Sequence, residues 1–244
     1  MEKHLLIFGA DGALGKGVTE TLLEKDYKRI YLFASHKNEI PETAKVVQIQ
    51  TGNLSEEQEV SKVFGDINPS KETMFFLFST IGGFTGGKRL FESEVNDLDN
   101  MINTNIKTSF LIGKYFSKLV KESAGGSILF TSAMTGLTPE KGKISYGLSK
   151  SSINYIVETL ALEGTEINLT ANAIAPYIID TPANRSWMGE NYDYGTLIKP
   201  VEVGELVQSV FLNFHFVSGN VIKLPGRIKL RNDIVGPDFV ILKK

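Results

Sequence analysis

The sequence contains no cysteine, and its 244 residues include only three histidines. Without cysteine, disulfide bonds, thiolate catalysis and cysteine-ligated zinc are excluded. His4, His36 and His215 are scattered along the chain and lack the short spacings typical of metal ligands. We therefore expect no metal site.

A strong net charge and long apolar runs are also missing. Lysine and arginine number 26 against 28 aspartates and glutamates, so no overall positive field would attract nucleic acid. No apolar run approaches the roughly 20 residues that span a bilayer, and the N-terminus lacks the basic and apolar regions of a signal peptide. The sequence thus predicts a cytoplasmic protein that binds neither nucleic acid nor a membrane.

What the chain does contain is an alternation of short apolar runs with longer amphipathic stretches. The runs predict seven strands, at residues 5–9, 29–34, 45–49, 74–79, 127–132, 169–175 and 220–224. Helical patterns fall between them, near 13–25, 55–65, 94–122, 145–164 and 202–214. Such alternation is typical of βαβ units. It predicts a Rossmann-type doubly wound α/β fold, a mainly parallel seven-stranded sheet with helices on both faces, with residues 1–244 as one domain and a lid at about 181–200.

The first predicted strand runs directly into a glycine-rich turn, Gly9-Ala-Asp-Gly12-Ala-Leu-Gly15, and a helical pattern follows. A pyrophosphate needs backbone N–H donors and a helix N-terminus at close range. Gly9 suits the tight turn, Gly12 leaves room for the cofactor, and Gly15 lets the helix pack close to the sheet. An ordinary βα turn could have the same glycine pattern. The place of this turn, between the first predicted strand and a helix, favours dinucleotide binding. The predicted contacts are Gly9, Asp11, Gly12, Ala13, Leu14 and Gly15.

The second predicted strand ends in Ser35-His36-Lys37. NAD-binding domains usually place an Asp or Glu near this point for the ribose 2′-hydroxyl, yet the first acid here is Glu39. Ser35, His36 and Lys37 could instead hold a 2′-phosphate, although a solvated turn would look the same. We therefore favour NADP as the cofactor, with NAD possible.

Tyr146-Gly-Leu-Ser-Lys150 begins the fourth helical pattern. Residues four apart lie on the same face of a helix. A tyrosine can protonate a developing alkoxide, and a nearby ammonium would lower the tyrosine pKa from its reference value of about 10. Exposed Tyr–Lys pairs are common and usually have no function. In a chain that also carries the glycine turn, however, this pair predicts a catalytic acid–base couple.

The glycine turn and the Tyr–Lys pair, in this order and separation, resemble the short-chain dehydrogenase/reductase family over nearly the whole chain. The resemblance implies an NAD(P)-dependent oxidoreductase. Asn105 looks like the family asparagine that supports the catalytic lysine through water. The resemblance also implies cofactor contacts by Asn53 and Leu54 beside the adenine, by Ser79, Thr80 and Gly82 after the fourth strand, and by Pro176, Ile179 and Thr181 around the nicotinamide amide.

One departure from the family concerns its catalytic serine, which usually lies 13 residues before the tyrosine, a position held here by Ala133. Ser132 lies one residue earlier, and one step along a strand turns a side chain to the opposite face. A bulged strand end could still present Ser132 to the site. Ser132 therefore stays a candidate catalytic residue, with Thr131 and Thr135 as possible substitutes.

Several features together resemble the dihydropteridine reductase branch, which reduces a quinonoid pterin: the 9–15 turn, the glycines of 82–87, the displaced serine and Asp180-Thr-Pro-Ala-Asn-Arg185. Asn105 and the missing acid after the second strand depart from that branch. The leading prediction is hydride transfer from NAD(P)H to a small carbonyl or C=N substrate, with pterin reduction as an alternative. A dinucleotide-binding sensor or scaffold without turnover is the alternative from another class.

Two further expectations concern the lid and assembly. The lid carries side chains that could close over a small substrate: Asn184, Arg185, Trp187, Met188, Tyr192 and Tyr194. Relatives pair long helices, and the stretches 94–122 and 145–164 carry apolar residues beyond one stripe, including Phe110, Phe116, Ile153 and Leu160. We expect a homodimer or homotetramer, although burial inside one chain would also explain these residues.

Overall fold

The computed structural model describes residues 1–36, 39–189 and 191–227. It contains one seven-stranded sheet in the order β3-β2-β1-β4-β5-β6-β7, and every neighbouring pair is parallel. The strands are β1 (Glu2–Phe8), β2 (Arg29–Ala34), β3 (Val46–Gln50), β4 (Thr73–Ser79), β5 (Gly125–Thr131), β6 (Leu169–Pro176) and β7 (Val221–Leu224). The predicted strands and the Rossmann-type sheet are thereby confirmed.

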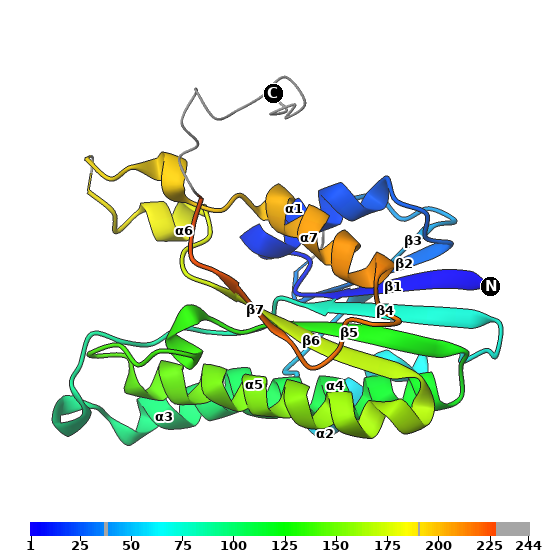
Figure 1. Cartoon of the computed structure of the whole chain (residues 1–244), viewed down its shortest axis with the longest axis horizontal. Coiled ribbons are helices and arrows are strands. Elements are labelled where there is room, and N and C mark those ends of the chain that lie inside the picture. Colours follow the sequence, from blue (N-terminus) through cyan, green and yellow to red (C-terminus); the bar gives the residue numbers. More distant parts are fainter. Residues whose placement is uncertain (37–38, 190, 228–244) are drawn as a thin grey trace.

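Helices cover both faces of this sheet. They are α1 (Ala13–Leu23), α2 (Glu57–Gly65), α3 (Val95–Met101), α4 (Thr108–Lys121), α5 (Ile144–Glu163), α6 (Pro182–Arg185) and α7 (Pro200–Leu212). Figure 1 shows α1 and α7 over one face, and α2, α4 and α5 over the other. The single helix predicted over 94–122 is interrupted, because a π-helical stretch at Ile102–Lys107 separates α3 from α4. None of the helices in the described ranges is long and apolar enough to cross a membrane.

Two apolar cores lie on the two faces of the sheet, and β1 shows how one strand feeds both. Leu6 and Phe8 pack toward α2, α4 and α5, whereas Leu5 and Ile7 pack toward α1 and α7. Alternate strand residues point to opposite faces, so a strand covered on both sides must be continuously apolar. Each such fully buried side chain contributes roughly 1.5–3 kcal/mol. This explains why the strands could be recognised as uninterrupted apolar runs.

The strand order creates a switch point between β1 and β4. From β1 the chain winds outward to β2 and β3, then returns to β4 and continues in the other direction. In open α/β sheets, ligands bind outside the carboxyl ends of the strands at such a point. The glycine turn follows β1 and Thr80 follows β4, so the fold brings two predicted cofactor segments to this place.

The predicted lid is partly structured. Helix α6 lies within it, and a second short helical turn forms at Tyr194–Thr196. Arg185 pairs with the Asp180 carboxylate, its Nη2 lying 2.8 Å from Oδ2, and its guanidinium stacks 4.6 Å from the centre of the Tyr194 ring. The Trp187 side chain is 65% exposed. Asp180 and Tyr194 therefore occupy the Arg185 guanidinium, while Trp187 stays accessible.

Candidate active site

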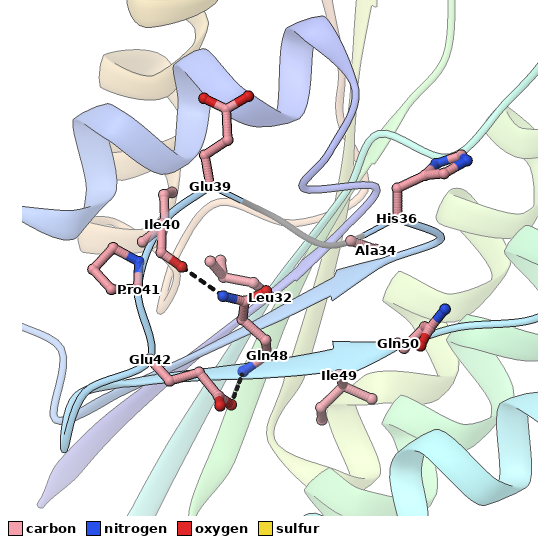
Figure 2. Close-up of a pocket in the computed structure, with 10 residues that line it drawn as sticks. All are labelled: Leu32, Ala34, His36, Glu39, Ile40, Pro41, Glu42, Gln48, Ile49 and Gln50. Carbon is pink, nitrogen blue, oxygen red and sulfur yellow. Dashed lines mark hydrogen bonds between the residues drawn. The ribbon is translucent and has the colours of Figure 1, made fainter.

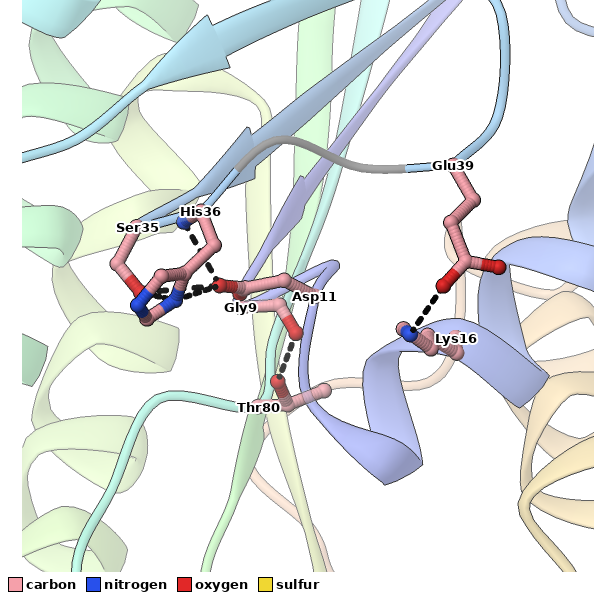
Figure 3. A network of polar contacts seen from close by, with 7 residues as sticks. All are labelled: Gly9, Asp11, Lys16, Ser35, His36, Glu39 and Thr80. Carbon is pink, nitrogen blue, oxygen red and sulfur yellow. Dashed lines mark hydrogen bonds and ion pairs between the residues drawn. The ribbon is translucent and has the colours of Figure 1, made fainter.

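The glycine turn is locked against the end of β4. Gly9 has a φ of +79°, a conformation that L side chains rarely adopt, and a Cβ there would collide with Thr80 Oγ1. Thr80 Oγ1 lies 3.0 Å from the Phe8 carbonyl oxygen. It also lies 3.1 Å from the Gly9 carbonyl oxygen, a contact that Figure 3 shows. Thr80 thus fixes the course of the turn, which is why no larger residue could replace Gly9.

The same turn leaves an open face at the start of α1. A Cβ on Gly15 would collide with the Gly9 carbonyl oxygen, whereas a Cβ on Gly12 would meet nothing closer than 3.4 Å. The first amides of a helix have no partner within the helix, so those of Ala13, Leu14 and Gly15 are available at this end. Amides at a helix N-terminus suit an anion such as a pyrophosphate.

Asp11 reaches from the glycine turn to the end of β2, where three groups contact its carboxylate (Figure 3). Ser35 Oγ donates to Asp11 Oδ2 at 2.9 Å, and the His36 backbone amide donates to the same oxygen at 3.0 Å. The His36 ring nitrogen Nδ1 lies 3.2 Å from it. The structure thus brings Asp11 of the glycine turn together with Ser35 and His36, two of the three residues predicted near the ribose 2′ position. The third, Lys37, lies outside the described residues.

Two other predicted contacts, Asn53 and Leu54, follow β3. The Asn53 side-chain oxygen accepts hydrogen bonds from the hydroxyl and the amide of Ser55, at 2.8 and 3.1 Å. Leu54 is 6% exposed and belongs to the core beneath α2 and α4. Asn53 is therefore the exposed member of the pair, while Leu54 supports the position from below.

The predicted nicotinamide-side contacts follow β6. Pro176 ends that strand, and Ile179 forms a parallel bridge with Ile198. Thr181 caps α6, its Oγ1 accepting a hydrogen bond from the Asn184 amide at 3.1 Å. These contacts hold the segment after β6 beside the carboxyl edge of the sheet.

Lys150 is the most deeply buried cation of the site, with 4% of the residue exposed. Its Nζ donates to the Thr131 carbonyl oxygen at 2.8 Å. Burial lowers the pKa of Lys150 to about 8. A Cβ on Gly82 would lie 2.9 Å from this Nζ, so the glycine makes room for the amine. Gly82, predicted as a cofactor contact, is thus seen to shape the lysine site.

Tyr146 lies half-buried at the start of α5, with Lys150 Nζ 5.8 Å from the centre of its ring. Burial raises the pKa of Tyr146 to about 12, and the Glu140 carboxylate adds to the rise. The sequence predicted the opposite direction, because it could not show how strongly the phenol is desolvated. In the chain without cofactor, Tyr146 is therefore fully protonated at neutral pH.

Asn105 connects this pair to the loop after β4. It is fully buried in the π-helical stretch, a feature frequent at functional sites. Its side-chain oxygen accepts from the Gly83 amide at 2.7 Å, and its nitrogen donates to Ser149 Oγ at 2.8 Å. Ser149 Oγ in turn donates to the Tyr146 carbonyl oxygen at 2.8 Å. Asn105 thus ties the 82–87 loop to the helix that carries Tyr146.

Sequence reasoning missed two residues of this arrangement. Ser149 lies between Tyr146 and Lys150, and its spacing of three from the tyrosine could have indicated its position. Phe84 packs edge-on against the Tyr146 ring with the ring centres 4.9 Å apart, and it is 63% exposed. Nothing in the sequence around Phe84 indicated that contact beyond its glycine-rich setting.

Ser132 and its possible substitutes are engaged in other contacts. Ser132 is 1% exposed, and its hydroxyl donates to the Lys150 carbonyl oxygen at 3.1 Å. Thr131 Oγ1 donates to the Ser79 carbonyl oxygen at 2.8 Å, and Thr135 Oγ1 donates to the Glu140 carboxylate. Ser132 therefore holds the helix that carries the Tyr–Lys pair.

No group of three or more histidine, aspartate or glutamate side chains within the described ranges gathers as metal ligands would. The groups that the site does present are a protonated phenol, a buried amine and a glycine turn at the start of a helix.

Comparison with known proteins identifies the family. The family profile described as short chain dehydrogenase matches residues 3–191. The chain is 26% identical to a dihydropteridine reductase of Dictyostelium discoideum over 233 residues, which cover 94% of this chain and 97% of that protein. It is 24% identical to carbonyl reductase family member 4 of Danio rerio over 239 residues, which cover 94% and 99% of the two chains.

Solved structures share the fold. The structure of ElxO with NADP bound superimposes with a TM-score of 0.78 at 22% identity, covering 92% of this chain and 97% of the other. A ligand-free aldohexose dehydrogenase of Thermoplasma acidophilum gives a TM-score of 0.77 at 19% identity, with coverage of 91% and 92%. Since the family profile spans most of the sequence, the protein belongs to the short-chain dehydrogenase family of NAD(P)-dependent oxidoreductases.

Proposed function

We propose that this chain reduces a small carbonyl or C=N substrate with NAD(P)H, and that Tyr146 donates the proton. The observation that carries the proposal is the setting of the Tyr146 hydroxyl. Tyr146 lies one helical turn before the buried Lys150, whose Nζ is 5.8 Å from the centre of the tyrosine ring, and none of the described residues hydrogen-bonds to the hydroxyl. The hydroxyl can therefore donate to a substrate, and the Lys150 ammonium would oppose the effect of burial, which raises the pKa of Tyr146 to about 12.

The residues along the carboxyl edge fit a dinucleotide. The open face at Gly12 and the first amides of α1 would receive the pyrophosphate. Lys150 would hold the nicotinamide ribose hydroxyls, and the segment carrying Thr181 would hold the nicotinamide amide. When bound, the reduced nicotinamide supplies a hydride, and the protein supplies position and electrostatics.

Proton transfer would proceed from Tyr146 to the substrate oxygen or nitrogen as the neighbouring carbon gains the hydride. A C=O group would thus become CH–OH, and the phenolate would recover its proton from solvent. The Lys150 amine, with its pKa of about 8, is mostly an ammonium at neutral pH and would stabilise that phenolate. Ser132 is given a positioning role, because its hydroxyl is bonded to the Lys150 carbonyl.

Pterin reduction is the second candidate. The Dictyostelium discoideum relative named dihydropteridine reductase matches nearly the full length of both chains. The exposed Phe84 ring beside Tyr146 offers a face on which a planar heterocycle could stack. A quinonoid pterin accepts a hydride and needs little help from a serine hydroxyl, which agrees with the position of Ser132.

The proposal is tested by measuring consumption of NADH and NADPH with ketones, sugars and quinonoid dihydropterin. Turnover with a carbonyl compound supports the leading proposal, and turnover with the pterin alone supports the second. Tight cofactor binding without turnover across the whole panel would favour the rival reading, a dinucleotide-binding sensor.

We also propose that α4 and α5 form a contact between copies of this chain. Phe116 and Ile153 lie in the core of one chain, at 0% and 1% exposure, so these two give no evidence for assembly. Phe110, Tyr155 and Leu162, by contrast, are 56%, 73% and 76% exposed. Phe110 and Tyr155 line one shallow hollow between the two helices. Exposed apolar surface of this kind often marks a protein interface.

Light scattering is expected to give two or four times the mass of the chain. Changing both Phe110 and Tyr155 to Ser should shift the protein toward the monomer, because it removes the largest exposed side chains of this hollow. A monomeric mass for the unmodified chain would refute the proposed contact.

A further inference from the structure

We infer that the Asp11 carboxylate accepts a hydrogen bond from the ribose 2′-hydroxyl of the cofactor. This contact would make the enzyme prefer NADH to NADPH. The inference rests on the proposed function, because it concerns the same cofactor site. The sequence places no acid directly after β2, and this absence, together with Ser35, His36 and Lys37, favoured NADP. The structure supplies the acid from a different element, the glycine turn.

The first observation is the position of the Asp11 carboxylate. Its side chain is 19% exposed, and it faces the end of β2, where the ribose 2′ position is expected in this fold. Partial burial works to raise the pKa of Asp11, but hydrogen bonds from Ser35 and His36 outweigh it and hold the pKa below its ordinary value. Asp11 is therefore an anion at neutral pH.

The second observation is that Asp11 engages the groups otherwise available to a phosphate. Ser35 Oγ and the His36 amide both donate to Asp11 Oδ2, and the His36 ring also approaches that oxygen (Figure 3). A 2′-phosphate would have to take these donors from a carboxylate while lying beside its negative charge. A 2′-hydroxyl, in contrast, can donate a hydrogen bond to the carboxylate.

The third observation is the charge of the neighbouring hollow, shown in Figure 2, which has a volume of about 570 Å³. Its lining includes His36, whose backbone amide donates to Asp11, and the two acidic residues Glu39 and Glu42. Lys16, a cation of the first turn of α1, lies 3.4 Å from the Glu39 carboxylate. The acidic residues of this hollow therefore add negative charge on the side of His36, and the cation Lys16 is paired with one of them.

Calorimetric titration with ADP-ribose and 2′-phospho-ADP-ribose tests this without requiring turnover. We expect the unmodified chain to bind ADP-ribose at least about 10-fold more tightly, since like charges placed side by side cost more than the roughly 1.4 kcal/mol of a tenfold ratio. Asp11→Ser should reduce that ratio by about 10-fold, mainly through tighter binding of the phosphorylated ligand. NADH and NADPH should show the same order.

Two variants control for folding and for simple loss of charge. Asp11→Asn keeps a side-chain oxygen for the His36 amide while removing the charge, so it should shift the ratio in the same direction with an unchanged unfolding temperature. Asp26→Ser removes one carboxylate from the opposite edge of the sheet, where Asp26 pairs with Lys3. It should leave the ratio unchanged.

A preference of the unmodified chain for the phosphorylated ligand, abolished by Lys37→Ala, would overturn the inference and leave the proposed function standing. An unchanged ratio in both Asp11 variants would also overturn it. Failure to bind either ligand would overturn the proposed function itself, together with this inference.

Discussion

Replacing Tyr146 with Phe lowers turnover by about 10²- to 10⁴-fold, the usual contribution of a positioned acid. Cofactor affinity should change by no more than about twofold, because the proposed cofactor contacts of the glycine turn, Lys150 and Thr181 all remain. The fold should also be unaffected, since the ring keeps its contact with Phe84. Steady-state kinetics and cofactor titration on the same preparation measure both effects.

The matched control for this variant is Tyr115→Phe. Tyr115 lies on α4, and its hydroxyl donates to Glu57 at 3.2 Å, away from the Tyr–Lys pair. Turnover of Tyr115→Phe should equal that of the unmodified chain. If Tyr146→Phe turned over as fast as this control, Tyr146 could not be the proton donor.

Replacing Lys150 with Met should abolish turnover and yet stabilise the chain without cofactor. Burial lowers the lysine pKa from 10.5 to about 8, a shift that corresponds to about 3 kcal/mol at neutral pH. Removing the buried amine therefore removes a destabilisation of this size. Loss of the Nζ–Thr131 hydrogen bond costs about 1 kcal/mol, so the net stabilisation is about 2 kcal/mol. Thermal unfolding at pH 7 should show a rise of about 4–8 °C.

The lowered pKa of Lys150 also makes the free energy of unfolding depend on pH. Between pH 8 and 10.5 the unfolded chain retains a proton on Lys150 that the folded chain has lost, so the stability of the unmodified chain rises with pH across this window. The advantage of Lys150→Met should therefore shrink as pH rises through it. Lys62→Met, on the exposed face of α2, should change stability by less than about 0.5 kcal/mol. A destabilised Lys150→Met at pH 7 would contradict the burial argument.

The fold was readily predicted because its signals are local. Each strand is an apolar run bounded by polar residues, and the glycine turn lies where a strand meets a helix. The interruption at 102–107 was not predictable in the same way, because a π-helical stretch changes the hydrogen-bond spacing and leaves the residue pattern intact.

The residues of the site could be predicted from the sequence, but their burial, pKa values and contacts could not. Spacing indicated that Tyr146 and Lys150 share a helix face, yet the direction of the Tyr146 pKa depends on burial, which spacing does not reveal. Asp11 was predicted as a cofactor contact within the turn. Its position against Ser35 and His36 depends on how the turn crosses the end of β2, a long-range relation that the sequence does not contain.

The most direct test of the central claim uses NADH deuterated at the transferable C4 position, with the substrate panel of ketones, sugars and quinonoid dihydropterin. We predict a reduced product that carries deuterium at the carbon attacked, with slower turnover than for unlabelled NADH. Tyr146→Phe should form the same labelled product, about 10²- to 10⁴-fold more slowly. Cofactor that binds but retains all of its deuterium with every substrate of the panel would contradict the assignment of this site as a reductase.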